Sequence, residues 1–155
     1  MDMLIRLYDT ATDDRPTAAL PMQLRKPLGA EHDFVVSWVA RHFSAGWASE
    51  ARAALTNRPI TLFIATQREP PELLGVCAYD ATVRGFVGPI GVAEQARGSG
   101  VGAALLQACL HDMRAMGYAY AVAGAVAAPG FFRRVAGATE IENSSPGIYS
   151  GMLRG

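Results

Sequence analysis

Three glycines at alternate positions, Gly98, Gly100 and Gly102, stand between a short apolar run and a long apolar helix pattern. The helix pattern has no acidic residue in its first turn. Its first backbone N–H groups have no intrahelical acceptor, and they lie at the positive end of the helix dipole. Glycine lets a phosphate approach these groups without a Cβ in the way, and Arg97 adds a fixed positive charge. The loop therefore predicts a binding site for a phosphate-bearing ligand.

Two common nucleotide-binding patterns do not fit this loop. A Walker loop ends in Gly-Lys-Ser or Gly-Lys-Thr, whereas Val101-Gly102-Ala103 has neither lysine nor hydroxyl. The spacing Gly98-x-Gly100-x-x-Ala103 matches a loose dinucleotide pattern, but no ribose-binding Asp or Glu occurs in the run from Tyr118 to Gly124. A glycine-rich turn that only joins a strand to a helix stays open on spacing alone.

The wider stretch resembles the coenzyme A loop of GNAT-type N-acetyltransferases. The family pattern is Arg or Gln, two residues, Gly, one residue, then Gly or Ala, and Arg97, Gly100 and Gly102 match it in register. The resemblance is specific over residues 86–137 and implies acetyl-CoA (coenzyme A) as co-substrate. The residues that it implies for cofactor binding are Ile90, Gly91, Val92, Arg97, Gly98, Ser99, Gly100, Val101, Gly102 and Phe132.

The fold implied is an α/β (α+β), GNAT-like single domain over residues 1–155, with a mixed, mostly antiparallel sheet of about six to seven strands flanked by about four helices. Apolar alternation predicts strands, and helical spacing predicts helices. The expected strands are 4–8, 22–25, 60–65, 73–79, 83–92, 118–126 and a closing hairpin of 139–141 with 148–153. The expected helices are 31–43, 47–55, 101–116 and 131–135, and residues 10–21 form a polar connection.

The strand before the loop contains Pro89, which cannot donate a ladder hydrogen bond, between Gly88 and Gly91. We expect this strand to be bulged or splayed from a neighbour. In the resembled family such a splay lets the pantetheine arm lie between strands. A simple edge strand is the alternative.

Composition limits the partners of this protein. A chain of 155 residues, half of them apolar, can bury about two thirds of its unfolded surface. Fourteen basic and fourteen acidic residues balance, so nothing favours a nucleic acid or a membrane surface as partner. Cys77 and Cys109 lie in apolar patterns typical of buried thiols in a reducing compartment. Without a basic leader or a span-length apolar run, we expect a cytoplasmic protein, and we expect no metal site.

The chemistry that the resemblance implies is direct acyl transfer from a thioester to a primary amine in a ternary complex. The amine must lose a proton to a base, for which Asp80 and Glu50 are the candidates. The family's usual acid is a tyrosine whose matching position here is Phe132, which has no hydroxyl. Tyr149 is the first substitute and Tyr79 the second. A turn role for Asp80, a solvated helix face for Glu50 and simple packing for the tyrosines stay open.

The acceptor pocket implied by the topology has aromatic walls of Trp47, Tyr79 and Tyr149, with the two candidate carboxylates to attract a cation. This favours a small-molecule (or peptide) primary amine as acceptor. The alternative function is a catalytically weak acyl-CoA-binding or sensing module, which Phe132 favours. Pairing of the N-terminal strand within the chain or in a homodimer is left open.

Overall fold

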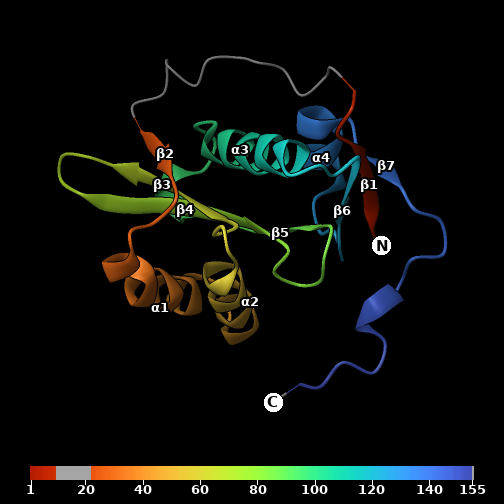
Figure 1. Ribbon diagram of the computed structural model, residues 1–155, viewed down its shortest axis with the longest axis horizontal. Helices are drawn as coiled ribbons and strands as arrows, with labels where there is room; N and C mark the ends of the chain where they lie inside the picture. Colours follow the sequence, from red (N-terminus) through yellow and green to blue (C-terminus); the bar gives the residue numbers. More distant parts are fainter. Residues whose placement is uncertain (10–21, 155) are drawn as a thin grey trace.

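The computed structural model describes residues 1–9 and 22–154. In this part of the chain, seven strands form one mixed sheet with the order β2-β3-β4-β5-β6-β1-β7 (Figure 1). The strands are β1 (Met3–Arg6), β2 (Gln23–Arg25), β3 (Leu62–Gln67), β4 (Glu72–Tyr79), β5 (Phe86–Val92), β6 (Tyr120–Ala123) and β7 (Thr139–Glu140). The connection expected over residues 10–21 lies outside the described residues.

Within residues 1–9 and 22–154, four α-helices flank the sheet: α1 (His32–His42), α2 (Ala45–Thr56), α3 (Val101–Ala115) and α4 (Pro129–Ala136). The described residues also form three short 3-10 helices, namely η2 (Gly29–Glu31), η3 (Glu94–Ala96) and η4 (Gly147–Tyr149). Figure 1 shows α1 and α2 on one face of the sheet and α3 and α4 on the other. None of the helices in the described ranges is both long and apolar enough to cross a membrane.

The two faces of the sheet carry separate cores. The apolar side of α3 packs on one face, where Leu105, Leu106 and Leu110 are fully buried together with Ile5 of β1. On the other face, α1 and α2 bury a second cluster that includes Val35 and Trp38. Burial of this apolar surface is the main favourable term that holds both helical layers to the sheet.

Helix α3 forms the crossover between the sheet's parallel neighbours, β5 and β6. Parallel strands need such a long connection, whereas the antiparallel neighbours β3, β4 and β5 are joined by short turns. The glycine loop lies at the start of this crossover, after the end of β5. The fold therefore brings the end of β5 and the N-terminus of α3 together.

The N-terminal strand pairs within the chain. Strand β1 lies between β6 and β7, with Met3 opposite Ala123 on one side and opposite Glu140 on the other. Both pairings are antiparallel, so the sheet does not require a second copy to supply this strand.

The closing hairpin expected at the C-terminus is wrong. Strand β7 has only two residues, and the segment expected as its partner forms η4 and then an extended tail outside the sheet (Figure 1). Gly147 and Gly151 adopt positive φ angles of 62° and 74°. Each turns the chain out of an extended path, so the alternating pattern of residues 148–153 never meets a strand edge.

Most strand boundaries are shifted from the expected ones, and two of these shifts, at the start of β5 and the end of β6, shape the site. Residues 83–85 belong to the turn before β5, where Gly85 has a φ of 86°. Strand β6 ends at Ala123 rather than Val126, because Ala125 adopts the left-handed region with a φ of 47°. The chain after β6 therefore leaves the sheet early, and it lines the cleft described next.

Candidate active site

A cleft of about 1540 Å³ runs between β5 and the segment after β6. Its walls come from the chain start, from α2, from the end of β5 with the start of α3, and from the segments that follow β6 and β7. Its lining includes Glu50, Val92, Gly102, Phe132 and Tyr149. Most of the sequence-predicted site residues therefore meet here, although they come from distant parts of the chain.

The cleft exists because β5 and β6 separate. Their pairing covers only Phe86 and Val87. In this parallel ladder alternate residues of β5 face β6, and Gly85 already accepts a hydrogen bond from Val122 N at 3.0 Å. Pro89 comes two residues after Val87 and has no N–H to continue the ladder. The splay expected from Pro89 is thus present.

A bulge turns the backbone of β5 beyond this point. The register between β4 and β5 shifts between Cys77 and Tyr79. After the shift, Ala93 N donates to Leu74 O at 2.8 Å. Because hydrogen-bonded residues alternate in an antiparallel pair, Ile90 and Val92 direct their N–H and C=O groups away from β4. These groups face the gap between β5 and β6, so an extended ligand in the gap could form hydrogen bonds with the backbone of β5.

The glycine loop presents the N-terminus of α3 without obstruction. Gly100 is the N-cap residue in a left-handed conformation with a φ of 86°, and no side chain caps the helix. Gly98 also has a positive φ, of 79°. The first turn contains no acidic residue. The free N–H groups and the dipole therefore suit a phosphate, which is the fit that a phosphate-bearing cofactor needs.

Arg97 lies between the gap and the helix N-terminus. Its Nε donates to Val92 O at 3.2 Å, so it binds one of the backbone groups that β6 leaves free. Arg97 is exposed and lines the cleft, as do Ile90, Val92 and Gly102. The charge of Arg97 is thus placed beside both halves of the expected cofactor site.

Some predicted cofactor residues lie behind the cleft or at its mouth. The side chain of Val101 is buried in the core at 5% exposure. Gly91 faces the opposite direction, where its missing side chain makes room for the ring of Phe43. Gly98, Ser99 and Gly100 form the exposed loop and do not line the cleft. These residues shape the site through the backbone.

Phe132 lies in the cleft wall on α4 together with Phe131. The two rings meet edge to face with centroids 5.2 Å apart. Phe131 also approaches Gly102, where a Cβ would lie 3.7 Å from its ring. This wall is apolar, and it supplies no proton donor at the position where the resembled family carries a tyrosine.

Tyr149 reaches the cleft from η4. Its hydroxyl occupies the space that a side chain at Gly124 would need, and the ring of Phe86 fills the rest of that space. Burial raises the pKa of Tyr149, and the negative charges of Glu50 and Asp2 raise it further. The phenol therefore stays protonated at neutral pH and is available as a donor.

Glu50 faces the cleft from α2. Desolvation raises the pKa of this carboxyl, although a hydrogen bond with the Thr82 side chain lowers it in part. Trp47 lies one helical turn earlier and also lines the cleft, with its ring 5.0 Å from that of Phe43. A half-buried carboxylate, a phenol and an indole thus share one end of the cleft.

Asp2 is a cleft residue that the sequence did not indicate. It is 7% exposed, and its Oδ1 accepts a hydrogen bond from Ala125 N at 2.9 Å. Its own backbone N–H donates to Ser144 Oγ at 2.7 Å. Asp2 therefore ties together the two segments that wall the cleft after β6 and β7. Nothing in the local pattern at the chain start marks it, because its partners are more than 120 residues away.

Asp80 and Tyr79 do not line the cleft, contrary to their predicted roles. Asp80 has a φ of 51° and organises the turn before β5, because its Oδ1 accepts from Gly85 N at 2.7 Å and its Oδ2 from the Tyr118 hydroxyl at 2.5 Å. Tyr79 is fully buried on the α3 side, where its hydroxyl donates to Asp112 Oδ2 at 2.8 Å. Burial raises the pKa of Tyr79. Asp80 is therefore not placed to act as the base in this cleft, nor Tyr79 as its wall or substitute acid.

Comparison with known proteins identifies the family. The family model described as "Acetyltransferase (GNAT) family" matches residues 30–138. The chain belongs to the GNAT family of acetyltransferases. This family uses acetyl-CoA as its acetyl donor, and the matched range contains the splayed strand, the glycine loop and α3. No curated protein matches the chain.

Solved structures agree with this fold. One is the GCN5-related glucosamine N-acetyltransferase region of a fungal multi-domain GH3 beta-N-acetylglucosaminidase, with 16% identity, a TM-score of 0.70, and coverage of 87% of this chain and 19% of that one. A GCN5-related N-acetyltransferase from Sphaerobacter thermophilus has 22% identity and a TM-score of 0.65, and the match covers 89% of this chain and 47% of that one. The Escherichia coli GNAT family N-acetyltransferase YhbS, in complex with CoA, has 22% identity and a TM-score of 0.50, and the match covers 68% of this chain and 62% of that one.

The chain thus spans 19%, 47% and 62% of the lengths of these three structures. At such identities they show the shared fold alone. Within residues 1–9 and 22–154, no group of three or more His, Cys, Asp or Glu side chains could hold a metal ion.

Proposed function

We propose that this GNAT-family chain transfers an acetyl group from acetyl-CoA to the primary amine of a small-molecule (or peptide) acceptor, by direct attack in a ternary complex. One observation supports this most strongly. The free backbone groups of β5, the uncapped N-terminus of α3, Glu50 and Tyr149 are all parts of or adjacent to the same cleft.

The cofactor site follows from the backbone. The N–H groups at the start of α3, with Arg97 beside them, suit the pyrophosphate, because both the helix dipole and the guanidinium favour an anion. The groups of Ile90 and Val92 that face the gap suit the amides of the pantetheine arm. When bound, acetyl-CoA supplies a thioester carbonyl and a thiolate leaving group.

Glu50 is the proposed base. An alkyl ammonium has a pKa of about 10.4 and must lose a proton before it attacks. A carboxylate with a raised pKa is better matched to this transfer near neutral pH, and desolvation raises the pKa of Glu50. The hydrogen bond with the Thr82 side chain stabilises the ionised carboxylate and so offsets part of this rise in pKa.

Tyr149 is the proposed acid in place of the hydroxyl that Phe132 lacks. Its pKa is raised by burial and by Glu50 and Asp2, so it holds its proton until the leaving sulfur develops charge. A thiol has a pKa of about 8.5, so the thiolate is a tolerable leaving group and the acid contributes a limited share of the rate.

The acceptor that this end of the cleft suits is a small cationic amine. Trp47 offers an apolar aromatic wall, and the carboxylates of Glu50 and Asp2 are the negative charges nearby. An aromatic face next to carboxylates attracts an ammonium group. A panel of amines should therefore favour cations over neutral or acidic molecules of the same size.

A second candidate function is an acyl-CoA-binding or sensing module with weak catalysis. The apolar wall of Phe131 and Phe132, with no hydroxyl at the usual position, favours it. Release of free coenzyme A with any amine above the uncatalysed aminolysis rate distinguishes the enzyme from this module.

The first experiment is thermal unfolding with and without acetyl-CoA. A ligand at about one hundred times its Kd stabilises the native state by about 2.7 kcal/mol, which raises the Tm of a domain of this size by several degrees. Gly100→Glu should abolish the rise, because it places a side chain and a negative charge at the helix N-terminus. Gly29→Glu is the control, since Gly29 lies in η2 with open space around it. Absence of any rise in the parent protein would refute the cofactor site.

The proposal includes two coarser expectations. Residues 1–155 act as one domain, which is supported by the pairing of β1 with β6 and β7. A cytoplasmic location is supported by Cys77 and Cys109, which are free and buried and so suit a reducing compartment.

A further inference from the structure

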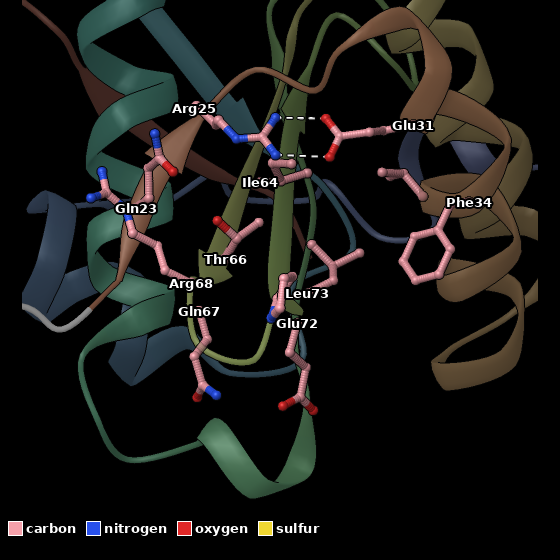
Figure 2. A pocket seen from close by; sticks show the side chains of 12 residues that line it. Gln23, Arg25, Glu31, Phe34, Ile64, Thr66, Gln67, Arg68, Glu72 and Leu73 are labelled. Carbon is pink, nitrogen blue, oxygen red and sulfur yellow. Dashed lines mark hydrogen bonds and ion pairs between the residues drawn. The ribbon is translucent and has the colours of Figure 1, made fainter.

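A second pocket, of about 360 Å³, lies at the other end of the sheet (Figure 2). It is bounded by β2, β3, the β3–β4 hairpin and the start of α1, and we call it the β2–α1 pocket. It shares no lining residue with the cleft of the candidate active site. Its volume lies at the lower end of the range that small-molecule sites occupy.

Cross-strand rows build the floor of this pocket. Gln23 of β2 lies opposite Thr66 of β3, and Thr66 lies opposite Leu73 of β4. Side chains opposite one another project from the same face of a sheet. The next row begins with Arg25 opposite Ile64. Val35 of α1 belongs to the same buried cluster as Ile64 and Leu73, whereas Gln23 and Thr66 stay partly exposed.

The deep part of the pocket is apolar. Ile64, Val35 and Leu73 are 1%, 1% and 6% exposed, so they form a rigid floor that belongs to the core under α1. Phe34 stands at the edge and is 58% exposed, which is unusual for an aromatic side chain of this helix. Figure 2 shows its ring beside the opening. This part can accept a compact apolar body.

An ion pair whose members bind each other forms one wall of the pocket. The guanidinium of Arg25 binds both oxygens of Glu31, at 2.6 and 2.8 Å, and Glu31 also accepts from Leu28 N at 2.8 Å. The hydrogen bond from Arg25 lowers the pKa of Glu31 to about 2, so the pair stays charged and closed at neutral pH. Neither member is free to neutralise a ligand.

Three other polar side chains at the pocket have no hydrogen-bond partner among the described residues: Gln23, Thr66 and Arg68. In Figure 2, Arg68 folds back from the hairpin so that its guanidinium lies near Gln23, on the side opposite Phe34. The nearby carboxylate of Glu72 points away, and it accepts from Gln95 Nε2 at 3.3 Å. Glu72 also lines the pocket, but the charged group beside the unpartnered Gln23 and Thr66 is the Arg68 guanidinium, which forms no ion pair with any described residue.

We propose that the β2–α1 pocket binds a small organic carboxylate with a compact apolar body. The carboxylate accepts hydrogen bonds from the Arg68 guanidinium, the Gln23 amide and the Thr66 hydroxyl, all of which can donate. The apolar body lies on Leu73 and Val35 beside the ring of Phe34. The inference does not depend on the proposed acetyl transfer, because no residue is shared between the two sites.

Benzoate is the probe, and the assay is an amide NMR titration of the full chain without acetyl-CoA. We expect shifts at Thr66, Arg68 and Leu73 that saturate with a Kd on the order of 1 mM, as suits so small a ligand. Benzamide, which has no charge, and benzylamine, which has the opposite charge, should each bind at least about fivefold more weakly.

Variants test the named contacts. Arg68→Gln should weaken benzoate at least about fivefold, since it removes a charge-assisted hydrogen bond at an exposed hairpin position. Arg52→Gln on α2 is the matched control and should leave binding unchanged, because Arg52 is exposed and lies outside the pocket. Phe34→Ala should weaken benzoate without loss of the preference for an anion.

The proposal is overturned by any of three results: no shift at the pocket at about 10 mM benzoate, equal or tighter binding of benzylamine, or unchanged affinity in Arg68→Gln. Each of these is read without measuring acetyl transfer.

Discussion

Gly100 and Gly102 are two residues apart in the same loop, yet replacement of each by alanine should change stability in opposite directions. Gly100 has a φ of 86°, in the left-handed region where a Cβ meets the following carbonyl. That conformation costs a non-glycine residue about 1–2 kcal/mol. Alanine at this position should therefore lower the free energy of unfolding by about that amount.

Gly102 has no such requirement. It lies in the first turn of α3, where a Cβ would meet Val92 Cγ2 at 3.5 Å and the ring of Phe131 at 3.7 Å. Both are ordinary van der Waals distances. Alanine in a helix is favoured over glycine by about 0.5–1 kcal/mol, because it restricts the unfolded chain more. Gly102→Ala should therefore raise the free energy of unfolding by up to that amount.

The assay is thermal unfolding followed by circular dichroism, without ligand. For a domain of this size 1 kcal/mol shifts the Tm by about 2–4 °C. Gly100→Ala should lower the Tm by about 2–8 °C, and Gly102→Ala should raise it by about 1–4 °C. Gly85→Ala, at a φ of 86° with open space, is the control for the first variant. Gly46→Ala, in the first turn of α2, is the control for the second.

Equal stability of Gly100→Ala and the parent protein would show that the left-handed N-cap is not required. A lower Tm for Gly102→Ala than for the parent would show that the wall formed by Val92 and Phe131 is tighter than the distances indicate. Either result would refute the account of the loop given above.

Three further predictions concern titratable groups. Tyr149→Phe should lower kcat on the order of 10²-fold, since it removes the proposed acid. Phe132→Tyr added to that variant should restore part of the lost kcat. Release of free coenzyme A measures kcat for both variants. Glu50→Gln should abolish the acid limb of the kcat/KM profile, because a base with a raised pKa loses activity as pH falls through that raised value; a limb that persists would exclude Glu50. Glu31→Gln should remove a contribution to the free energy of unfolding that is present above the ordinary carboxyl pKa of about 4.3 and is lost as pH falls toward about 2. The reason is that the hydrogen bond from Arg25 depresses the pKa of Glu31 in the folded state. Urea midpoints of the variant and the parent protein, measured against pH, test this prediction, and identical curves would contradict it.

The features predicted correctly from the sequence depend on short-range physics. The glycine loop, the helix that follows and the interruption at Pro89 are all set by which backbone groups a few neighbouring residues leave free. The four helices follow from apolar spacing within single segments. Such features hold in most tertiary contexts, so one sequence is enough to indicate them.

The closing hairpin and the roles of Asp80 and Tyr79 show where this reasoning fails. The alternating pattern of residues 148–153 is compatible with a strand, but a strand also needs a partner edge, which the chain path after Gly147 does not provide. The expectation that Asp80 lies near the acceptor depends on topology alone. Its oxygens are bound by Gly85 and Tyr118, and the second of these bonds spans 38 residues of the chain.

The sequence by itself determined the uncapped, glycine-rich start of α3, the break in β5 and hence the family resemblance, because these depend on local backbone geometry. The tertiary structure decided which side chains face the cleft. Glu50, Tyr149 and Asp2 meet there because a bulge turns β5, a left-handed residue ends β6 early, and β1 inserts between β6 and β7. Each of these three features depends on contacts between distant parts of the chain, and the energy of such contacts cannot be judged from neighbouring residues.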